Sequence, residues 1–564
     1  MARPRALAWA LSFVSLASWT TTAGADWPVS PLANVPVCTA AGGQSVHALV
    51  GDGLGGVIAV WQDSRSGDDD IYAQRLSAAG VARWAPNGVS VSVAGGEQVY
   101  PQAVPDGAGG AIIVWEDFRN GGTSDVYAQR IDASGAMQWT PGGVALCTAA
   151  AFQLFPMVVS DGAGGAVVVW TDERMSGCRN FYAQRVGADG TPQWTADGVA
   201  LTTAVVDQQP PAVTSDDSSG VIITWHAVTS GILHARAQRV DGSGTPRWGT
   251  NGVALANVGA QVDPRIAGDG AGGAIVAWAD YRSGDGMTTT TYAQRVNAAG
   301  VSQWTANGVA LATPSGDQQY QAVVPDGVGG VVVVWSDHTT TAIRAQRVNA
   351  SGVLQWPLSG VPVCSGSGEH QVNRIQSDGA GGVLVPWSDY RVGGGDVYVQ
   401  RVNAAGTPVW TIDGVATCTA PYVQAGPMLI SDGSGGALVA WSDYRGGDNW
   451  HVYAQNIGAG GTLGGSTLGV VEGPPHAALA VSCAGANPHR GALAVECSLP
   501  DGGTAVVGLF DVSGRCLESR ALPDLGAGTQ HVAFSAAGAR APGVYLVRLV
   551  QGARSAAMRI VLVR

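Results

Sequence analysis

The residues best suited to chemistry recur at a fixed spacing. An Asp stands two residues after a Trp in seven places, and in six of them an Arg follows two residues later. The aspartates are Asp63, Asp117, Asp172, Asp280, Asp337, Asp389 and Asp443, and the arginines are Arg65, Arg119, Arg174, Arg282, Arg391 and Arg445. Such a pair could bind a carboxylate or a sugar. Because an active site needs one constellation, a pair repeated in almost every unit is better explained as a charge-assisted contact that holds each unit together.

Other motifs that carry chemistry do not occur. The chain contains neither G-x-S-x-G nor H-E-x-x-H. Its "DGAGG" turns lack the alternating oxygen ligands and closing Glu of a calcium loop, and no Lys-Ser/Thr follows them as in a phosphate loop. The scattered histidines His226, His234, His338 and His370 are expected at the surface. We therefore identify no catalytic residue, no metal site and no cofactor.

The elements that position the Asp–Arg pairs are eight repeated units. Each contains an apolar run that ends in Trp, at intervals of 52 to 57 residues: Trp61, Trp115, Trp170, Trp225, Trp278, Trp335, Trp387 and Trp441. A Gly-rich turn precedes each run, a "YAQR"-like segment follows it, and a second Trp segment, "W-x3-GV", follows the "YAQR" segment in the first seven units. With the "P-x-x-V-S" segment before the turn, a complete unit predicts four short strands joined by tight turns.

Four strands in a unit of this length are typical of a propeller blade. A solenoid is the rival architecture, but the chain shows no distinct end caps. After the last "YAQN", at residues 453–456, no Trp strand follows, whereas residues 27–38 closely match residues 356–364. The sequence therefore predicts an all-β, eight-bladed β-propeller in which the N-terminal strand, residues 27–38, closes the last blade and removes an exposed edge.

The motif "P-x-x-x-S-D-G … W-x-D-x-R-x-G-x-x-D-x-Y-A-Q-R" resembles the repeat of TolB-like propellers, over about residues 27–461. The resemblance implies that the "P-x-x-V-S" strand is innermost and the Trp-led closing strand outermost. The fourth and sixth units depart from the pattern, because Arg236 and Arg344 replace the Tyr. We expect those two blades to be irregular.

The C-terminal part loses the repeat and reads as about seven short strands, which suggests an Ig-like β-sandwich. The segments "NPHRGALAVECSLPDGG", "LFDVSGR", "PGVYLVRL" and "RIVLVR" follow one another from Asn487 to Arg564. In this order they resemble the FlgD-type Ig-like module and the C-terminal sorting domains of type IX secretion substrates. The sorting resemblance implies contact with a secretion machinery, and the alternative is an accessory β-domain. The predicted organisation is a signal peptide at 1–25, a propeller at 26–461, a linker at 462–475 and the Ig-like domain at 476–564.

Charge and the N-terminus indicate destination. The net charge is −12 and no basic run occurs, which argues against nucleic acid as a partner. Arg3 and Arg5 precede an apolar stretch at residues 6–17 and an A-x-A site at residues 23–25, the pattern of a secretory signal peptide. The stretch is too short to span a bilayer. We predict a bacterial protein that is secreted or held at the outer cell surface, without a transmembrane segment, as a monomer.

Four of the eight cysteines occupy equivalent repeat positions: Cys38, Cys147, Cys364 and Cys418. Equivalent positions in different blades are too far apart to bridge. Cys483 and Cys497 lie on neighbouring candidate strands, and they are the pair to test for a disulfide.

A ligand site, if present, is expected on the face that carries the variable loops. The loops that join outer to inner strands on this face carry a repeated and therefore structural glutamine: Gln44, Gln98, Gln153, Gln208, Gln261, Gln318, Gln371 and Gln424. The non-repeated aromatic residues here are the candidate ligand-binding residues for glycan or extracellular protein: Tyr100, Phe152, Phe155, Tyr320, Tyr422 and Trp450. Local packing of these side chains is the alternative.

Three functions stay open: a scaffold that binds glycan or protein, a polysaccharide-degrading lyase or glycosidase on the same fold, and an envelope protein without a ligand. Non-repeated ionisable groups with perturbed pKa values that converge in the centre would favour the enzyme. A flat aromatic patch would favour binding.

Overall fold

The computed structural model describes residues 27–464, except 176–177, 204–207, 209–210, 230, 314–315, 367 and 373. Beyond them it describes residues 480–483, 494–499, 504–511, 515–522, 528–534, 543–551 and 554–562. These residues form strands and turns without a helix, as the all-β prediction requires, so none of them belongs to a helix that could cross a membrane. The predicted signal peptide, 1–25, lies outside the described residues.

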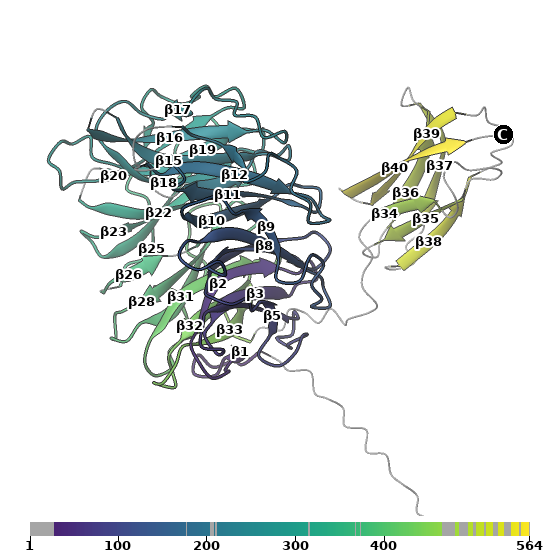
Figure 1. Ribbon diagram of the computed structural model, residues 1–564. Helices are drawn as coiled ribbons and strands as arrows, with labels where there is room; N and C mark the ends of the chain where they lie inside the picture. Colours follow the sequence, from purple (N-terminus) through teal and green to yellow (C-terminus); the bar gives the residue numbers. More distant parts are fainter. Residues whose placement is uncertain are drawn as a thin grey trace, which may run out of the picture. The chain divides into compact units, whose positions relative to one another are not determined.

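The first of two compact units, Met1–Thr467, consists of repeated antiparallel sheets (Figure 1). The first four sheets are β2 (Gln44–Gly51), β3 (Val57–Asp63), β4 (Asp70–Leu76) and β5 (Val89–Ser92); β6 (Gln98–Pro105), β7 (Ala111–Asp117), β8 (Asp125–Ile131) and β9 (Val144–Cys147); β10 (Gln153–Ser160), β11 (Ala166–Asp172), β12 (Asn180–Val186) and β13 (Val199–Ala200); and β14 (Ala212–Ser215), β15 (Val221–Thr229), β16 (Ile232–Val240) and β17 (Val253–Ala254). The next four are β18 (Gln261–Gly268), β19 (Ala274–Asp280), β20 (Thr290–Val296) and β21 (Val309–Ala310); β22 (Gln318–Pro325), β23 (Val331–Asp337), β24 (Ala342–Val348) and β25 (Val361–Cys364); β26 (His370–Val372), β27 (Gln376–Ser377), β28 (Val383–Asp389), β29 (Asp396–Val402) and β30 (Val415–Cys418); and β31 (Gln424–Ser431), β32 (Ala437–Asp443), β33 (His451–Ile457) and β1 (Val35–Cys38).

The repeated turn before each Trp strand is held by its aspartate. The Asp106 carboxylate accepts N–H bonds from Ala108 and Gly110, at 2.7 and 2.8 Å, and a guanidinium bond from Arg130 on β8. A Cβ on Gly110 would lie 2.0 Å from the carbonyl oxygen of Ile131, so only glycine fits there. The turn thus fixes how β6 connects to β7.

The sheets follow one another around a closed ring. Each first strand contacts the first strand of the next sheet, and β31 of the last sheet contacts β2 of the first. As predicted, the N-terminal strand completes the last sheet, because β1 pairs antiparallel with β33 and Val35 lies opposite Ala454. Trp27 is buried and donates its indole N–H to the carbonyl of Ala78. The ring is therefore closed by main-chain hydrogen bonds between its two ends.

The sheet of β26–β30 departs from the others, which the sequence did not predict. Its inner strand is interrupted between β26 and β27, opposite Pro386, which has no N–H for a sheet ladder. His370 lies opposite Asp389, the place that Gln44 takes opposite Asp63. The assignment of Gln371 to the repeated glutamines is therefore wrong, and the expectation of His370 at the surface is also wrong, because His370 is buried.

The second unit, Leu468–Arg564, has seven strands among its described residues. They are β34 (Ala480–Cys483), β35 (Ala494–Leu499), β36 (Ala505–Phe510), β37 (Cys516–Leu522), β38 (Gly528–Ala533), β39 (Gly543–Gln551) and β40 (Arg554–Leu562). They form two sheets, in the orders β34-β35-β38 and β37-β36-β39-β40, around one apolar core that includes Val495, Leu509 and Val547. Cys497 is buried with a free thiol, so the disulfide considered for it is not formed.

Candidate functional site

The repeated Trp, Asp and Arg residues form buried clusters within the sheets. In the third sheet the Trp170 indole donates to Asp172 at 2.8 Å, and Arg174 donates to the same carboxylate through its Nε and backbone N–H. The Arg174 guanidinium also lies 3.9 Å from the centre of the Tyr182 ring. All eight tryptophans of this position are at most 1% exposed. The cluster leaves no free carboxylate for a ligand, and this geometry fits the structural interpretation of the repeat.

The candidate aromatic residues separate into two groups on the inner strands and loops. Tyr100 is 47% exposed and its ring lies 5.7 Å from that of Phe155 and 6.0 Å from that of His47. Tyr422 is 62% exposed and contacts Tyr444, which in turn contacts Trp450. Phe152 is half-buried, and Tyr320 lies on β22.

The row His47–Tyr100–Phe155 depends on an unusual backbone. Tyr100 and Phe155 have φ values of 52°, in the left-handed region, and the strand register shifts beside each of them. The Tyr100 N–H faces the Gln62 side chain of the preceding sheet at 3.4 Å, and the Phe155 N–H donates to Glu116. The bulges therefore turn two aromatic side chains out of their strands and tie them to the neighbouring sheet.

A cavity of about 810 Å³ occupies the centre of the ring. All eight sheets contribute to its wall, which confirms that the "P-x-x-V-S" strands are innermost. Its charged lining residues are Arg265, Arg374 and Asp263, so cations outnumber anions there although the whole chain carries −12. The volume is in the range of ligand sites.

Arg374 lies at the interruption of the inner strand and reaches the second sheet. Its guanidinium donates to the Gln102 side chain on β6. Desolvation lowers the pKa of Arg374, although the residue as a whole is exposed to solvent. Burial, with a smaller effect of the Arg374 charge, lowers the pKa of His47 to about 4. His47 is therefore neutral at pH 7.

A second polar group lies on the wall formed by β15 and β18. The Asp263 N–H donates to Nδ1 of His226 at 3.2 Å, so a neutral His226 carries its proton on Nε2. Desolvation lowers the pKa of His226. Asp263 and Arg265 are both exposed to the cavity. Arg374 and the pair of His226 and Arg265 therefore lie on separate walls of the cavity.

Glu116 supplies a buried carboxyl group beside the aromatic row. It is 1% exposed, and burial raises its pKa to about 7, against the hydrogen bond from the Phe155 N–H, which lowers it. A carboxyl group with such a pKa exchanges its proton near neutral pH.

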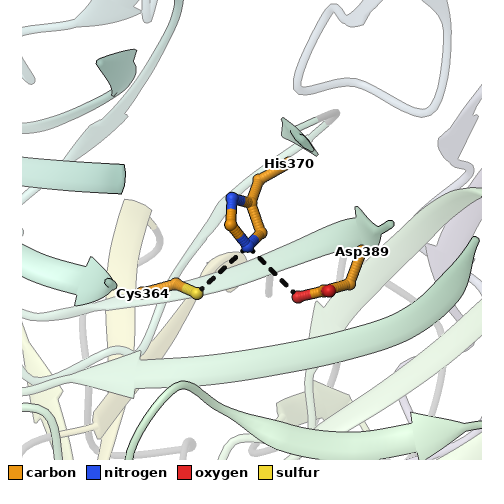
Figure 2. A group of neighbouring side chains, drawn as sticks. All are labelled: Cys364, His370 and Asp389. Carbon is orange, nitrogen blue, oxygen red and sulfur yellow. Dashed lines mark hydrogen bonds and ion pairs between the residues drawn. The ribbon is translucent and has the colours of Figure 1, made fainter. Parts of the chain in front are cut away.

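One group of side chains among the described residues has the atoms to hold a metal ion (Figure 2). His370 Nε2 lies 3.4 Å from Cys364 Sγ and 3.3 Å from Asp389 Oδ2, and His370 Nδ1 lies 2.9 Å from the Thr341 carbonyl. However, Arg391 donates to both Asp389 and Cys364, so a guanidinium already supplies the positive charge. The hydrogen bond to Asp389 helps to raise the pKa of His370 to about 9 against desolvation. The cluster is thus satisfied as a buried network of ionic hydrogen bonds.

The sequence predicted which strands are innermost, and these strands line the cavity. It did not reveal the polar residues of the cavity wall. In seven sheets the position four residues after the buried Gln, or after His370, faces the cavity and does not repeat. Its occupants there are Gln102, Met157, Ala212, Arg265, Ala322, Arg374 and Met428, whereas in the first sheet Ala48 is buried in the core and Val46 lines the cavity. An arginine in two of eight otherwise uncharged positions was the signal that could have revealed the site.

The chain is similar to some solved structures at low sequence identity. No protein-family model matches the chain, and no curated protein matches it. Among solved structures, an ulvan lyase of polysaccharide lyase family 25 is 11% identical with a TM-score of 0.39, over 68% of this chain and 95% of that one. A Dyadobacter fermentans protein of unknown function is 13% identical with a TM-score of 0.32, over 58% and 97%. An endo-arabinase from Bacteroides thetaiotaomicron is 15% identical with a TM-score of 0.27, over 47% and 97%.

Proposed function

We propose that this chain is a secreted eight-bladed β-propeller whose central cavity binds an acidic glycan. The observation that carries the proposal is the pair Arg265 and Arg374 in the wall of a cavity of about 810 Å³. A guanidinium binds a carboxylate or sulfate through two parallel hydrogen bonds, which suits uronic acids and sulfated sugars. The chain carries a net negative charge, so the rest of its surface repels anions. An acidic glycan is therefore expected to bind at these two arginines rather than elsewhere on the surface.

The aromatic row extends the site from the cavity onto the face. Tyr100 and Phe155 are exposed, and their bulged backbone is tied to the preceding sheet. Flat aromatic surfaces pack against the apolar faces of sugar rings. An acidic glycan would therefore place its charged groups near Arg265 and Arg374 and a neighbouring ring against Tyr100.

A second candidate function is elimination from such a glycan, and it is favoured by the neutral His47 beside Tyr100 and Arg374. Arg374 would stabilise the negative charge that develops on a uronate when the proton next to its carboxylate leaves. His47 would accept that proton, the bond to the leaving sugar oxygen would break, and the oxygen would take a proton from solvent, to which His47 returns its own, which leaves a double bond in one product. The elimination needs no oxidant, reductant or cofactor.

The C-terminal unit completes the proposal. Its seven strands around one core suit an Ig-like sandwich, and the ordered motifs resemble sorting modules. We propose that it directs the propeller to the cell surface through a secretion machinery, after removal of the signal peptide at residues 1–25.

The experiment is an array of neutral, carboxylated and sulfated oligosaccharides probed with the full chain from residue 26. Binding confined to acidic members, and lost in an Arg265→Gln/Arg374→Gln variant, supports the proposal. Equal binding to neutral members, or no binding, contradicts it. If an unsaturated product absorbs during incubation with the bound glycan, the protein catalyses elimination. If the glycan stays unchanged, the protein binds it without cleaving it.

A further inference from the structure

The fourth sheet lacks the carboxylate around which the other sheets are built. In six sheets the buried Trp donates its indole N–H to the Asp two residues later, at 2.7 to 2.8 Å. In the fourth sheet Ala227 stands at that position, paired with Gln208 as Asp63 is paired with Gln44. The indole N–H of Trp225 is buried and has no hydrogen-bond partner. The Trp335 indole of the sixth sheet also has none, although Asp337 is present there, so the fourth sheet is distinguished by the missing carboxylate itself. A buried donor without a partner costs about 1–3 kcal/mol and calls for an explanation.

A guanidinium nevertheless reaches the place that the loop arginine takes in the other sheets. Arg236 comes from β16, opposite Trp225, at the position of the repeated Tyr. Its Nε and NH2 atoms donate to the carbonyls of Asn251 and Gly252, at 2.9 and 3.0 Å. In the first sheet Arg65 donates to the corresponding carbonyl, that of Asn87. Arg236 therefore replaces the loop arginine of the other sheets.

The sixth sheet shows that an arginine from this position can bind the repeated carboxylate. Arg344 stands opposite Trp335 as Arg236 stands opposite Trp225, and its Nε lies 3.2 Å from Asp337. Arg236 has no acidic partner among the residues that the structure describes, and desolvation lowers its pKa. In the second sheet desolvation of Arg119 is outweighed by Asp117, and the Arg119 pKa is raised.

The space left by the absent side chain is a pocket of about 240 Å³. Trp225, Ala227 and Arg236 line it together with Thr229, Thr250 and Asn251, and no acidic residue lines it. The pocket thus combines an unused buried donor, a cation without a counter-ion among the described residues, and open volume.

We propose that this pocket of the fourth sheet binds a small carboxylate anion of the size of acetate. The anion takes the place of the Asp side chain, with one oxygen accepting from the Trp225 indole and the other from the Arg236 guanidinium. This site is separate from the central cavity, and it does not depend on the glycan proposal. For an anion of four heavy atoms, we expect a Kd on the order of 1 mM.

The test uses the full chain from residue 26 with ¹⁵N-labelled tryptophan. Sodium acetate is titrated at constant ionic strength, and indole N–H resonances are followed by NMR, with the Trp225 signal assigned through Trp225→Phe. We expect a saturable downfield shift of this signal, and no shift of the Trp170 signal, because the Trp170 indole already donates to Asp172. Arg236→Gln should weaken binding at least tenfold.

Ala227→Asp is the matched variant, because it restores the residue of the repeat and is expected to fold. It should move the Trp225 signal without acetate and abolish the response to acetate. A Trp225 signal that does not saturate with acetate, or that responds equally in Ala227→Asp, overturns the proposal. An equal response to sodium chloride overturns the assignment to a carboxylate.

Discussion

The buried Trp–Asp–Arg clusters and the central cavity use the same repeat in opposite ways. In the clusters almost every sheet places the same residues in the same contacts. Their carboxylate oxygens accept hydrogen bonds from the indole and guanidinium groups and are not available to a ligand. In the cavity the equivalent position of the inner strands holds Gln, Met, Ala or Arg, depending on the sheet, and Arg265 and Arg374 remain open to solvent. The repeated residues thus stabilise the ring, whereas the proposed ligand contacts come from positions at which the repeat is interrupted.

Truncation of a cluster tryptophan should have the largest effect. Trp170 is completely buried, and Trp170→Ala should lower the free energy of unfolding of the propeller by about 3–5 kcal/mol through the cavity it leaves. Chemical denaturation measures this change. Glycan affinity below the unfolding transition should stay the same, and a large loss of affinity there would break the distinction between the two regions.

Glu116 should make stability depend on pH. Its pKa is raised to about 7 in the folded chain, so the native state holds this proton more tightly than the unfolded state, and stability falls as pH rises through that range. Glu116→Gln should therefore match the wild type near pH 4 and exceed it by about 3 kcal/mol above pH 8. Equal denaturation midpoints at both pH values would contradict the assignment.

Arg374→Gln should weaken binding of an acidic glycan about 10- to 100-fold, because a charge-assisted hydrogen bond contributes about 1.5–3 kcal/mol. The same substitution should change stability little, since Arg374 keeps solvent contact. Titration calorimetry with the wild type and the variant measures the loss. Arg247→Gln is the control, because Arg247 is 55% exposed and pairs with Asp241 outside the cavity.

Tyr100→Ala should have the smallest effect, a three- to tenfold loss of affinity from about 1 kcal/mol of stacking. Tyr100→Phe should retain the affinity of the wild type. If Tyr100→Ala destabilised the fold as strongly as Trp170→Ala, the Tyr100 ring would belong to the packed core. The distinction between the buried clusters and the residues proposed to bind glycan would then be wrong.

The repeat predicted the strand order and the closure, because residues 27–38 match a closing strand and their absence would leave β33 with an open edge. In the seventh unit the repeat assigned the wrong residue to the position opposite Asp389. His370 and Gln371 are adjacent in the sequence, and only the strand pairing shows that His370 takes this position. The cavity residues escaped prediction for a related reason. The bulges at Tyr100 and Phe155 interrupt the alternation of side chains, so the facing of Gln102 cannot be counted from the strand start.

The most direct test of the central claim is calorimetric titration of one acidic oligosaccharide and its carboxyl-reduced, neutral analogue against three proteins. These are the wild type, Arg265→Gln/Arg374→Gln and Arg247→Gln. If the two cavity arginines bind the acidic group, the wild type and Arg247→Gln bind the acidic sugar and not the neutral one. The double variant then binds neither sugar. Binding of the acidic sugar by the double variant with the affinity of the wild type would contradict it.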